Sequence, residues 1–325
     1  MEYSEISFPV GTRILVTGGA GFIGSNICEA LVEKGVQVVC LDNFSTGKKE
    51  NISHLFGNHL FTFVEGDITS FDVCLELSKN VDYIIHEAAW GSVPRSIEMP
   101  LFYEKNNILG TLNIFEAAKI NKVKKVVYAS SSSVYGDSLI LPKKEGKEGN
   151  VLSPYALTKK VNEEYAKLYY KLYGVKTIGL RYFNVFGKRQ NSNGEYAAVI
   201  PKFINACINN KPSYINGDGS YSRDFTYIDN VVEANLLACL TNNELAFGEV
   251  FNVACGDRIT ILDVYHKIAK CIGCNLKPLL REKRVGDVPH SNADISKIHT
   301  IIGYKPIIFF DEGIYKTIKW YKEQS

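Results

Sequence analysis

Two side chains four positions apart, Tyr155 and Lys159, have the types and spacing of an acid–base pair. Ser153 and Pro154 precede them and are typical of the N-cap and the first position of a helix, which would place both side chains on one face, about one turn apart. A phenol has a pKa of about 10, and an adjacent ammonium or a nearby cationic ring favours its phenolate. The pair could therefore take a proton from a substrate hydroxyl.

A run of serines is separated from this segment by a polar loop and lies where a predicted strand over residues 125–130 ends. Ser131 or Ser132 could hydrogen-bond the same substrate oxygen and help its proton leave. A tyrosine and a lysine at this spacing are common by chance, and the ordinary explanation is an amphipathic helix. The catalytic interpretation therefore depends on the elements that would position these side chains.

The composition of the chain narrows the class of protein. Its 325 residues are 46% hydrophobic and 22% charged, which is enough for a large core and two closely packed lobes. A net charge of +2 favours neither a nucleic-acid-binding stripe nor a membrane-surface face. No apolar run approaches the roughly 20 residues of a membrane span, and the N-terminus lacks the basic segment of a signal peptide. We therefore expect a cytoplasmic protein without nucleic-acid or membrane partners.

The cysteines and histidines do not predict a metal site. Most of the eight cysteines lie inside apolar runs, as small core residues do in a reducing compartment. Only Cys271 and Cys274 have the spacing of a metal or redox motif, and no second pair accompanies them. The six histidines show no ligand spacing.

The N-terminal segment has the pattern of a dinucleotide-binding turn. A short apolar strand over residues 13–17 is followed at once by a glycine-rich turn and a helical pattern. Gly18, Gly21 and Gly24 would let the backbone turn tightly and approach a pyrophosphate, while the start of the helix offers free amide groups to the phosphates. This order of strand, turn and helix is the context that the motif requires.

A carboxylate follows at the expected distance. A second strand over residues 37–41 ends at Asp42, about 20 residues beyond the glycine turn, where it would accept hydrogen bonds from a ribose. Asp42 favours NAD over NADP, because a carboxylate would repel a 2′-phosphate. Lys48 and Lys49 lie close by and leave NADP open as an alternative.

Later strand ends supply further candidates. A strand over residues 60–64 is followed by Asp67, which could meet the amino group of an adenine. A strand over residues 81–86 is followed by Ala88 and Ala89, whose small side chains could let a cofactor pass or could simply pack tightly.

The remaining elements continue the alternation. We expect a long helix over residues 100–120, the strand over 125–130, a helix over 154–173 and a strand over 175–181. This rhythm predicts an α/β fold with a doubly wound parallel sheet, the Rossmann type, over residues 1–181. Residues 182–325 are predicted to form mainly a smaller C-terminal α/β substrate-binding lobe, with some segments crossing back to the sheet.

Segments along the whole chain resemble, in order, those of the extended short-chain dehydrogenase/reductases that act on sugar nucleotides. They are GGAGFIGSN, LDNFSTG, EGDI, SSSVYG, SPYALTKK, GLRYFNVFG, DGSYSRDFTYIDN and RVGDVPHSNADISK. Within that branch, AAWGSVPRS and RYFNVFGKRQ are most similar to segments of bacterial 4-epimerases of UDP-N-acetylhexosamines. The resemblance implies a permanently bound NAD and 4-epimerisation of UDP-N-acetylglucosamine or UDP-N-acetylgalactosamine through a transient 4-keto sugar, for surface polysaccharide synthesis.

The resemblance also implies roles for individual residues. Tyr155 would take the proton of the sugar 4-hydroxyl with help from Ser131 and Ser132, while Lys159 would hold the ribose and lower the pKa of Tyr155. The implied cofactor contacts are Gly18, Gly21, Phe22, Ile23, Gly24, Asp42, Asn43, Ser45, Thr46, Gly47, Asp67, Ile68, Ala88, Ala89, Asn106, Ser130, Tyr155, Lys159, Tyr182 and Val185. The implied substrate contacts are Gly91, Ser92, Ser131, Ser132, Asn184, Ala198, Val199, Tyr214, Arg223, Arg284, Asp287 and Ser291, the two arginines being candidates to clamp a diphosphate.

Local differences within the branch bear on the substrate. Dehydratases of this type carry an Asp-Glu pair, and decarboxylases a glutamate, where this chain has Ser132 and Ser133, so dehydration is disfavoured. Ser291 is small where relatives confined to non-acetylated hexoses tend to have tyrosine, which leaves volume for an N-acetyl group. Trp90 is larger than the expected leucine and could shift preference toward UDP-N-acetylglucosaminuronate, UDP-glucuronate or UDP-glucose.

Two further expectations follow from the resemblance. The helices over residues 100–120 and 154–173 would pair with their copies in a homodimer. A non-catalytic NAD-sensing scaffold on the same fold is the alternative of a different class; such proteins usually lose the base or the lysine, and this chain keeps both.

Overall fold

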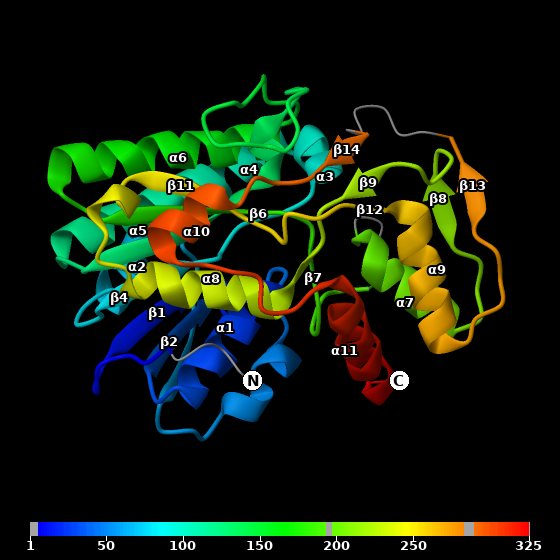
Figure 1. Cartoon of the computed structure of the whole chain (residues 1–325). Coiled ribbons are helices and arrows are strands. Elements are labelled where there is room, and N and C mark those ends of the chain that lie inside the picture. Colours follow the sequence, from blue (N-terminus) through cyan, green and yellow to red (C-terminus); the bar gives the residue numbers. More distant parts are fainter. Residues whose placement is uncertain (1–5, 193–196, 283–288, 325) are drawn as a thin grey trace.

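The computed structural model describes residues 6–192, 197–282 and 289–324 (Figure 1). Within these ranges, seven strands form one parallel sheet in the order β11-β6-β5-β4-β1-β2-β3. The strands are β1 (Arg13–Thr17), β2 (Gln37–Asp42), β3 (Phe61–Glu65), β4 (Tyr83–His86), β5 (Lys125–Ser131), β6 (Thr177–Tyr182) and β11 (Glu249–Val253). The predicted doubly wound α/β fold is confirmed.

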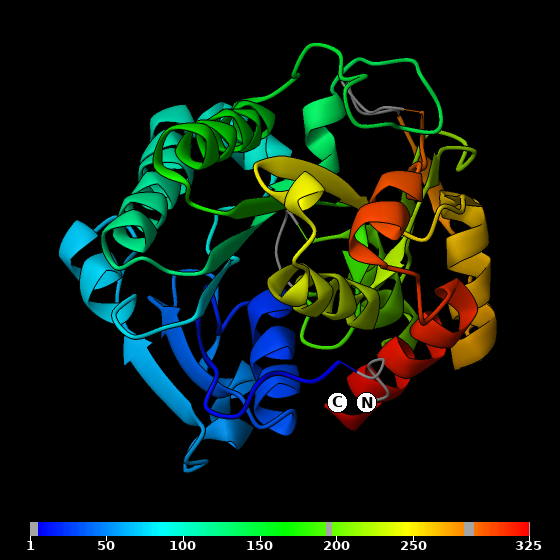
Figure 2. The ribbon, with the colours of Figure 1, turned by 60° about the vertical axis from the view of Figure 1, so that its left-hand side comes forward.

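Helices cover both faces of this sheet (Figure 2). One face carries α1 (Phe22–Glu33) and α8 (Ile228–Leu240), which contact each other. The other carries α2 (Phe71–Leu77), α5 (Gly110–Ile120) and α6 (Pro154–Tyr173). This three-layer arrangement buries both faces of the parallel strands, as such sheets require.

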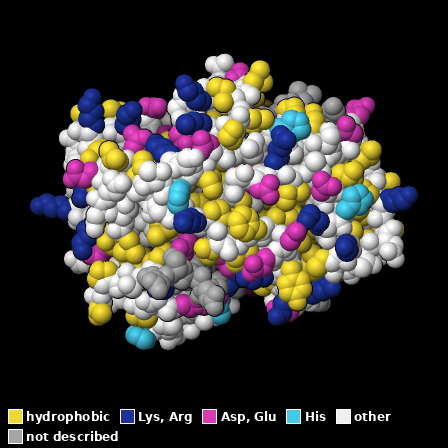
Figure 3. All heavy atoms as spheres, in the orientation of Figure 1, with side chains coloured by type: hydrophobic (Ala, Val, Ile, Leu, Met, Phe, Trp, Pro, Cys, Tyr) yellow, Lys and Arg dark blue, Asp and Glu magenta, His cyan; other side chains and the backbone are white. Residues whose placement is uncertain are grey.

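The surface carries mixed charge. On the face shown in Figure 3, lysine and arginine side chains are interspersed with aspartate and glutamate side chains. Among the described residues, none of the helices combines the length and the apolar character needed to cross a membrane. All eight cysteines are free thiols.

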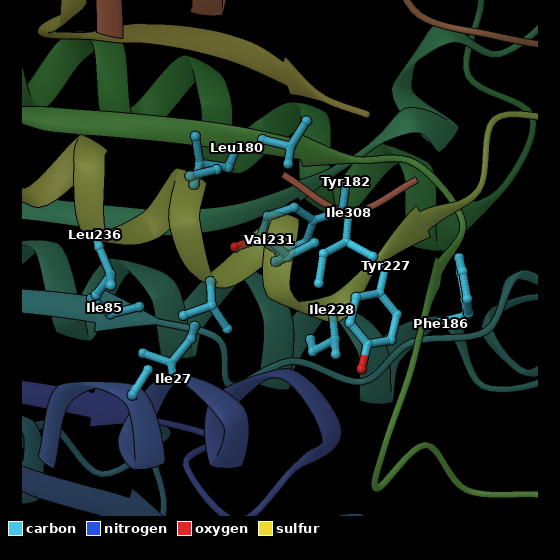
Figure 4. Packing of buried hydrophobic residues seen from close by; sticks show 14 of the residues in the cluster. Ile27, Ile85, Leu180, Tyr182, Phe186, Tyr227, Ile228, Val231, Leu236 and Ile308 are labelled. Carbon is cyan, nitrogen blue, oxygen red and sulfur yellow. The ribbon is translucent and has the colours of Figure 1, made fainter. Parts of the chain in front are cut away.

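The strands alternate their side chains between two cores. Ile14 and Val16 point into a core shared with α1 and α8, whereas Leu15 between them belongs to the core under α2, α5 and α6. Figure 4 shows part of the first core, where Leu236 of α8 lies beside Ile85 of the sheet and Ile27 of α1 belongs to the same cluster. The period of two in a strand thus places adjacent apolar residues on opposite faces.

The strand order reverses between β1 and β4, which creates a crevice at their carboxyl ends. The side chains of Thr17 and His86, the last residues of these strands, share a hydrogen bond of 2.7 Å between Oγ1 and Nδ1. The chain leaves β1 through Gly18 and leaves β4 through Glu87. Ligands of doubly wound sheets bind at such a switch point.

The prediction of a single long helix over residues 100–120 is wrong in one detail, because the segment is not a continuous α-helix. It consists of α4 (Pro100–Tyr103), a π-helical turn η3 (Glu104–Leu109) and α5. The widened turn carries Asn107, whose buried amide accepts from the Trp90 backbone N–H at 2.8 Å and donates to the Trp90 carbonyl at 3.1 Å. Such turns often accompany functional sites, and this one fixes the loop after β4.

Most of the second half of the chain builds a smaller α/β region beside the sheet, and α8 and β11 return to the sheet itself. Its helices are α7 (Val199–Ile208), α9 (Ile261–Ile272), α10 (Ser296–Ile302) and α11 (Phe310–Glu323). Its strands are β7 (Val185–Phe186), β8 (Tyr214–Asn216), β9 (Ser222–Arg223), β10 (Thr226–Tyr227), β12 (Ile259–Thr260), β13 (Leu279–Arg281) and β14 (His290–Ser291). Shorter elements elsewhere are α3 (Val93–Glu98) and the 3-10 turns η1 (Lys49–Asn51), η2 (Ser53–Leu55), η4 (Ser132–Tyr135) and η5 (Glu244–Ala246).

A buried ion pair ties α6 to the sheet. Arg181 in β6 is 1% exposed and donates to both carboxylate oxygens of Glu163 in α6, each at 2.8 Å. Ser130 in β5 donates to the same carboxylate at 2.6 Å, and Glu148 also accepts from Arg181. The pair therefore fixes α6 against β5 and β6.

We predict that Glu163→Gln lowers the free energy of unfolding by about 2–4 kcal/mol, because it leaves the buried Arg181 charge poorly compensated. Glu164→Gln is the matched control: this neighbouring carboxylate is exposed and pairs with Lys160 at 3.7 Å, so its loss should cost about 0.5 kcal/mol or less. Urea-induced unfolding of both variants measures the difference. Equal losses would contradict the importance of the buried pair.

Candidate active site

The crevice at the carboxyl ends of β1 to β4 contains a cavity of about 310 Å³. Its walls come from the glycine turn, the ends of β2 and β3, the loop after β4 and the π-helical turn η3. The predicted cofactor contacts that line it are Gly18, Gly21, Phe22, Ile23, Gly24, Asp42, Asn43, Ser45, Thr46, Asp67, Ile68, Ala88, Ala89 and Asn106. Residues far apart in the sequence thus meet around one cavity.

The glycine turn depends on close backbone contacts. A Cβ atom on Gly18, which has a φ of +67°, would lie 2.7 Å from the Ala88 nitrogen, and one on Gly24 would lie 2.2 Å from the Gly18 oxygen. No side chain caps the start of α1 after Gly21, so the amide groups of its first turn are open to an anionic ligand. The turn therefore presents backbone, without side chains, to the cavity.

Asp42 is held rigidly at the end of β2. Its carboxylate accepts hydrogen bonds from the backbone N–H groups of Ala20, at 3.0 Å, and Phe44, at 2.8 Å. Burial raises the pKa of Asp42, and these hydrogen bonds offset part of that rise. Gly47 does not line the cavity but packs behind the carboxylate, since a Cβ there would lie 2.8 Å from Asp42 Oδ1.

Asp67 is oriented by its neighbours at the end of β3. Its carboxylate accepts from the Asn43 side-chain amide at 2.9 Å and from the Thr69 backbone at 2.7 Å. Burial alone would raise the pKa of Asp67, but the hydrogen bonds from Thr69 and Asn43 lower it. Asp67 is therefore a fixed acceptor beside Asn43 in the cavity wall.

The acid–base candidates meet at the end of β5. Ser153 caps α6 as predicted, accepting a backbone amide of the first turn at 3.1 Å. The Ser131 hydroxyl lies near enough to the Tyr155 phenol to lower its pKa, and Lys159 donates from Nζ to the Ala129 carbonyl at 2.8 Å. The structure thus brings Tyr155, Lys159 and Ser131 together, while Ser132 begins the adjacent turn η4.

Burial dominates the pKa values of this pair. It raises the pKa of Tyr155, with Glu87 adding to the rise and the hydrogen bond from Ser131 opposing it. Burial also lowers the pKa of Lys159 to about 8. The expected lowering of the Tyr155 pKa by Lys159 is not found, because the ammonium is directed to the Ala129 carbonyl.

Some predicted cofactor contacts lie outside the cavity lining. Ser130 directs its hydroxyl to the buried Glu163 carboxylate, and Val185 lies in β7. Tyr155 and Lys159 are not among the lining residues, and Tyr182 donates a hydrogen bond to the lining residue Glu87.

The sequence did not single out Glu87, which lines the cavity directly after β4. The Tyr182 hydroxyl donates to Glu87 Oε1 at 2.6 Å, and burial raises the pKa of Glu87 to about 7. The sequence feature that could have identified Glu87 is a charged residue between a buried strand and two alanines. Leu41, Gly66 and Trp90 also line the cavity.

Gly91 connects the cavity to the catalytic tyrosine candidate. It lines the cavity beside Trp90, and its carbonyl accepts from the Tyr103 hydroxyl. The Tyr103 ring meets the Tyr155 ring edge-to-face, with centroids 6.3 Å apart. Ser92 follows with a φ of +91° and caps α3. The loop after β4 therefore extends along the cavity to the position of Tyr155.

A second hollow of about 180 Å³ collects predicted substrate contacts in the smaller region. Its lining includes Asn184, Val199, Tyr214 and Arg223. The Asn184 amide donates to the Asp224 carbonyl at 3.0 Å, which joins the turn after β6 to the segment after β9.

The remaining substrate candidates fall into two groups. Ser291 lies on β14, in register opposite Arg223 of β9, and Ala198 is the residue before α7. Arg284 and Asp287 lie outside the described residues.

Comparison with known proteins matches residues 14–254 to the NAD dependent epimerase/dehydratase family. The chain belongs to this family. A UDP-glucose 4-epimerase of Mycolicibacterium smegmatis is 36% identical over 96% of this chain and 99% of that protein. A UDP-glucuronate 4-epimerase of Thermodesulfobacterium geofontis is 35% identical over 95% of this chain and 96% of that protein.

A solved family member has nearly the same structure. The UDP-N-acetylglucosamine 4-epimerase of Methanobrevibacter ruminantium, in complex with UDP-N-acetylmuramic acid, superimposes with a TM-score of 0.93 and 40% identity over 98% of this chain and 100% of that one. The cavity fits the family's dinucleotide. Bare backbone at Gly18 and Gly24 leaves room for a pyrophosphate, and the fixed Asp42 carboxylate can accept from a ribose.

Proposed function

We propose that this NAD-dependent UDP-sugar 4-epimerase acts on UDP-N-acetylhexosamines, interconverting UDP-N-acetylglucosamine and UDP-N-acetylgalactosamine for surface polysaccharide synthesis. The observation that carries the proposal is the position of Tyr155, whose ring contacts Tyr103, the residue that donates to the carbonyl of the cavity-lining Gly91. Similarity to the Methanobrevibacter ruminantium UDP-N-acetylglucosamine 4-epimerase over the whole chain supports the acetylated substrate.

In this proposal, Tyr155 removes the proton of the sugar 4-hydroxyl, and the Ser131 hydroxyl, which lies near the phenol, hydrogen-bonds the same sugar oxygen and helps its proton leave. Bound NAD supplies the acceptor and then the donor of the hydride at C4. Lys159, fixed by the Ala129 carbonyl, holds the ribose. The 4-keto sugar rotates to expose its other face before the hydride returns to C4 and the proton returns from Tyr155. The configuration at C4 is therefore inverted without net oxidation.

The small side chain of Ser291 supports an acetylated sugar. Ser291 is paired in register with Arg223, the candidate ligand of a diphosphate, so both lie where β9 and β14 meet. A serine at this position leaves volume that a tyrosine would fill. We propose that this volume accommodates the N-acetyl group.

A uronate form of the same sugar is the second candidate. The Arg95 guanidinium lies 5.2 Å from the Trp90 ring centroid, and Trp90 lines the cavity beside Gly91. A cation held next to the sugar side of the cavity favours a carboxylate at C6. UDP-N-acetylglucosaminuronate therefore belongs in the same substrate test.

We also propose that the chain forms a homodimer through α4, α5 and α6. Large apolar side chains are exposed along these helices, among them Leu101 at 78% and Leu172 at 62%. Exposed apolar residues grouped on neighbouring helices are typical of an interface. Light scattering should give twice the mass of one chain, and a monomeric mass would contradict this interface.

We predict that Tyr155→Phe lowers kcat about 10²- to 10⁴-fold while bound NAD and affinity for UDP stay unchanged, because only the proton acceptor is lost. Tyr165→Phe, farther along α6 and 37% exposed, is the control and should keep full turnover. Steady-state kinetics and nucleotide extraction measure both. Full turnover in Tyr155→Phe would remove the catalytic assignment.

The substrate is tested by incubating the purified protein, without added NAD, with UDP-N-acetylglucosamine, UDP-glucose, UDP-glucuronate and UDP-N-acetylglucosaminuronate. Products are resolved by anion-exchange chromatography or NMR. We expect UDP-N-acetylglucosamine to be converted much faster than UDP-glucose. Conversion of a uronate alone would contradict the proposed substrate and leave the mechanism in place.

We predict that Ser291→Tyr lowers the ratio of kcat/KM for UDP-N-acetylglucosamine over UDP-glucose by about tenfold or more, because the ring fills the volume for the acetyl group. Ser291→Ala removes the hydroxyl but keeps the volume, so it should leave the ratio unchanged. Equal effects of both substitutions would show that the Ser291 hydroxyl, and not the volume beside it, determines the preference for the acetylated substrate.

A further inference from the structure

The carboxylate of Glu87 is fixed at the cavity wall from behind. Its Oε1 accepts from the Tyr182 hydroxyl at 2.6 Å, and that hydroxyl accepts from the Asn235 side-chain amide at 2.9 Å. Asn235 is fully buried in α8 and also donates to the Val231 carbonyl at 2.9 Å. Figure 4 shows Tyr182 beside Val231 in this core. A rigid chain of hydrogen bonds therefore orients Glu87.

Glu87 lies at the reactive end of the cavity. Its charge raises the pKa of both Tyr155 and Lys159, and the Lys159 charge lowers the pKa of Glu87. The geometry agrees, because Lys159 donates to the Ala129 carbonyl and Ala129 follows Tyr128, the register partner of His86, so this carbonyl lies on the strand next to Glu87. Burial raises the pKa of Glu87 to about 7, so the carboxylate is ionised in mildly alkaline solution.

Few other groups around Glu87 change their charge near neutrality. Burial lowers the pKa of His86 to about 3 and raises that of Cys239 on α8 to about 12, and the pKa of Tyr182 is also raised by burial. Lys159 has a pKa of about 8 and is the one other titrating neighbour among the described residues that interact with Glu87.

The chemistry at Tyr155 locates the hydride carrier. The proton leaves the oxygen on C4, and the hydride leaves C4 itself, so the ring that accepts the hydride must contact the same carbon. A nicotinamide ring that takes this hydride would therefore bind near Tyr155, at the part of the cavity that Glu87 lines. A nicotinamide ring is cationic when oxidised and neutral when reduced, so a fixed anion beside it favours the oxidised form.

We propose that Glu87 sets the redox preference of the cavity, its carboxylate stabilising the oxidised cofactor over the reduced one. The inference rests on the proposed nucleotide cavity and on Tyr155, and it is independent of which UDP-sugar binds. An enzyme without net redox chemistry needs its cofactor oxidised at the start of every turnover. Glu87 provides that bias from within the protein.

A different role for Glu87 would be to neutralise Lys159. The two roles make different predictions about nucleotide binding. An unneutralised Lys159 ammonium would itself repel the cationic ring, so the two roles are separated by removing the Lys159 charge. In a Lys159→Met background, Glu87→Gln should still lower the ratio of NAD+ to NADH affinity if the carboxylate acts directly on the ring, and should leave the ratio unchanged if Glu87 acts only through Lys159.

The test uses the purified protein and Glu87→Gln, which keeps an acceptor for Tyr182 and removes the charge. Each is incubated at pH 8 with a fixed mixture of NAD+ and NADH until the bound ratio is constant. Unbound nucleotide is removed by gel filtration, and bound NAD+ and NADH are measured after acid and alkaline extraction. Glu116→Gln on α5, a carboxylate that contacts Lys119 and Tyr169, is the control for net charge.

We expect the bound ratio of NAD+ to NADH to fall about tenfold in Glu87→Gln and to stay unchanged in Glu116→Gln. Tyr182→Phe, which frees the carboxylate without removing it, should cause a smaller fall. In the unaltered protein the ratio should also fall as the pH is lowered through about 7, because Glu87 becomes protonated.

An unchanged ratio in Glu87→Gln, with nucleotide still bound, would overturn the inference and leave the proposed function intact. Absence of bound nucleotide in the unaltered protein would overturn both.

Discussion

The structure depends on how closely the glycine turn after β1 approaches the loop after β4. There is no room for a Cβ atom at Gly18 against Ala88, or at Gly24 against the Gly18 carbonyl. This contact sets the start of α1 at the switch point of the sheet, so its open amide groups face the crevice. It also fixes where the chain leaves β4, and the loop that follows carries Glu87, Trp90 and Gly91 along the cavity.

Burial then determines the chemistry at the far end of this cavity. Lys159, Tyr155 and Glu87 all have pKa values displaced toward their neutral forms, because the sheet and α6 remove them from water. The protein alone therefore keeps Tyr155 protonated near neutrality. A positive charge brought to this end of the cavity by a bound ligand would favour the phenolate of Tyr155. Proton removal by Tyr155 would thus depend on the ligand being bound. The buried Arg181–Glu163 pair keeps α6 in the register that this arrangement needs.

Short-range patterns predicted much of this arrangement. The glycine turn, the strand that ends at Asp42 and the Ser153 cap of α6 are local signals, and the observed helix has the predicted bounds Pro154–Tyr173. The role of Glu87 was not predictable, because it depends on Tyr182, 95 residues away, and on Asn235 in α8. The π-helical turn was missed for the same reason, since Asn107 bonds a loop 17 residues away. The direction of the Lys159 ammonium likewise follows from tertiary packing.

In the proposed mechanism, C4 loses and regains its hydride within the nucleotide cavity, and Tyr155 takes and returns the proton. The most direct measurement is to convert UDP-N-acetylglucosamine carrying deuterium at C4, in ordinary water and without added NAD, and to analyse the product by NMR and mass spectrometry. The account predicts that the galacto product keeps its deuterium at C4. Replacement of that deuterium by solvent hydrogen would contradict it.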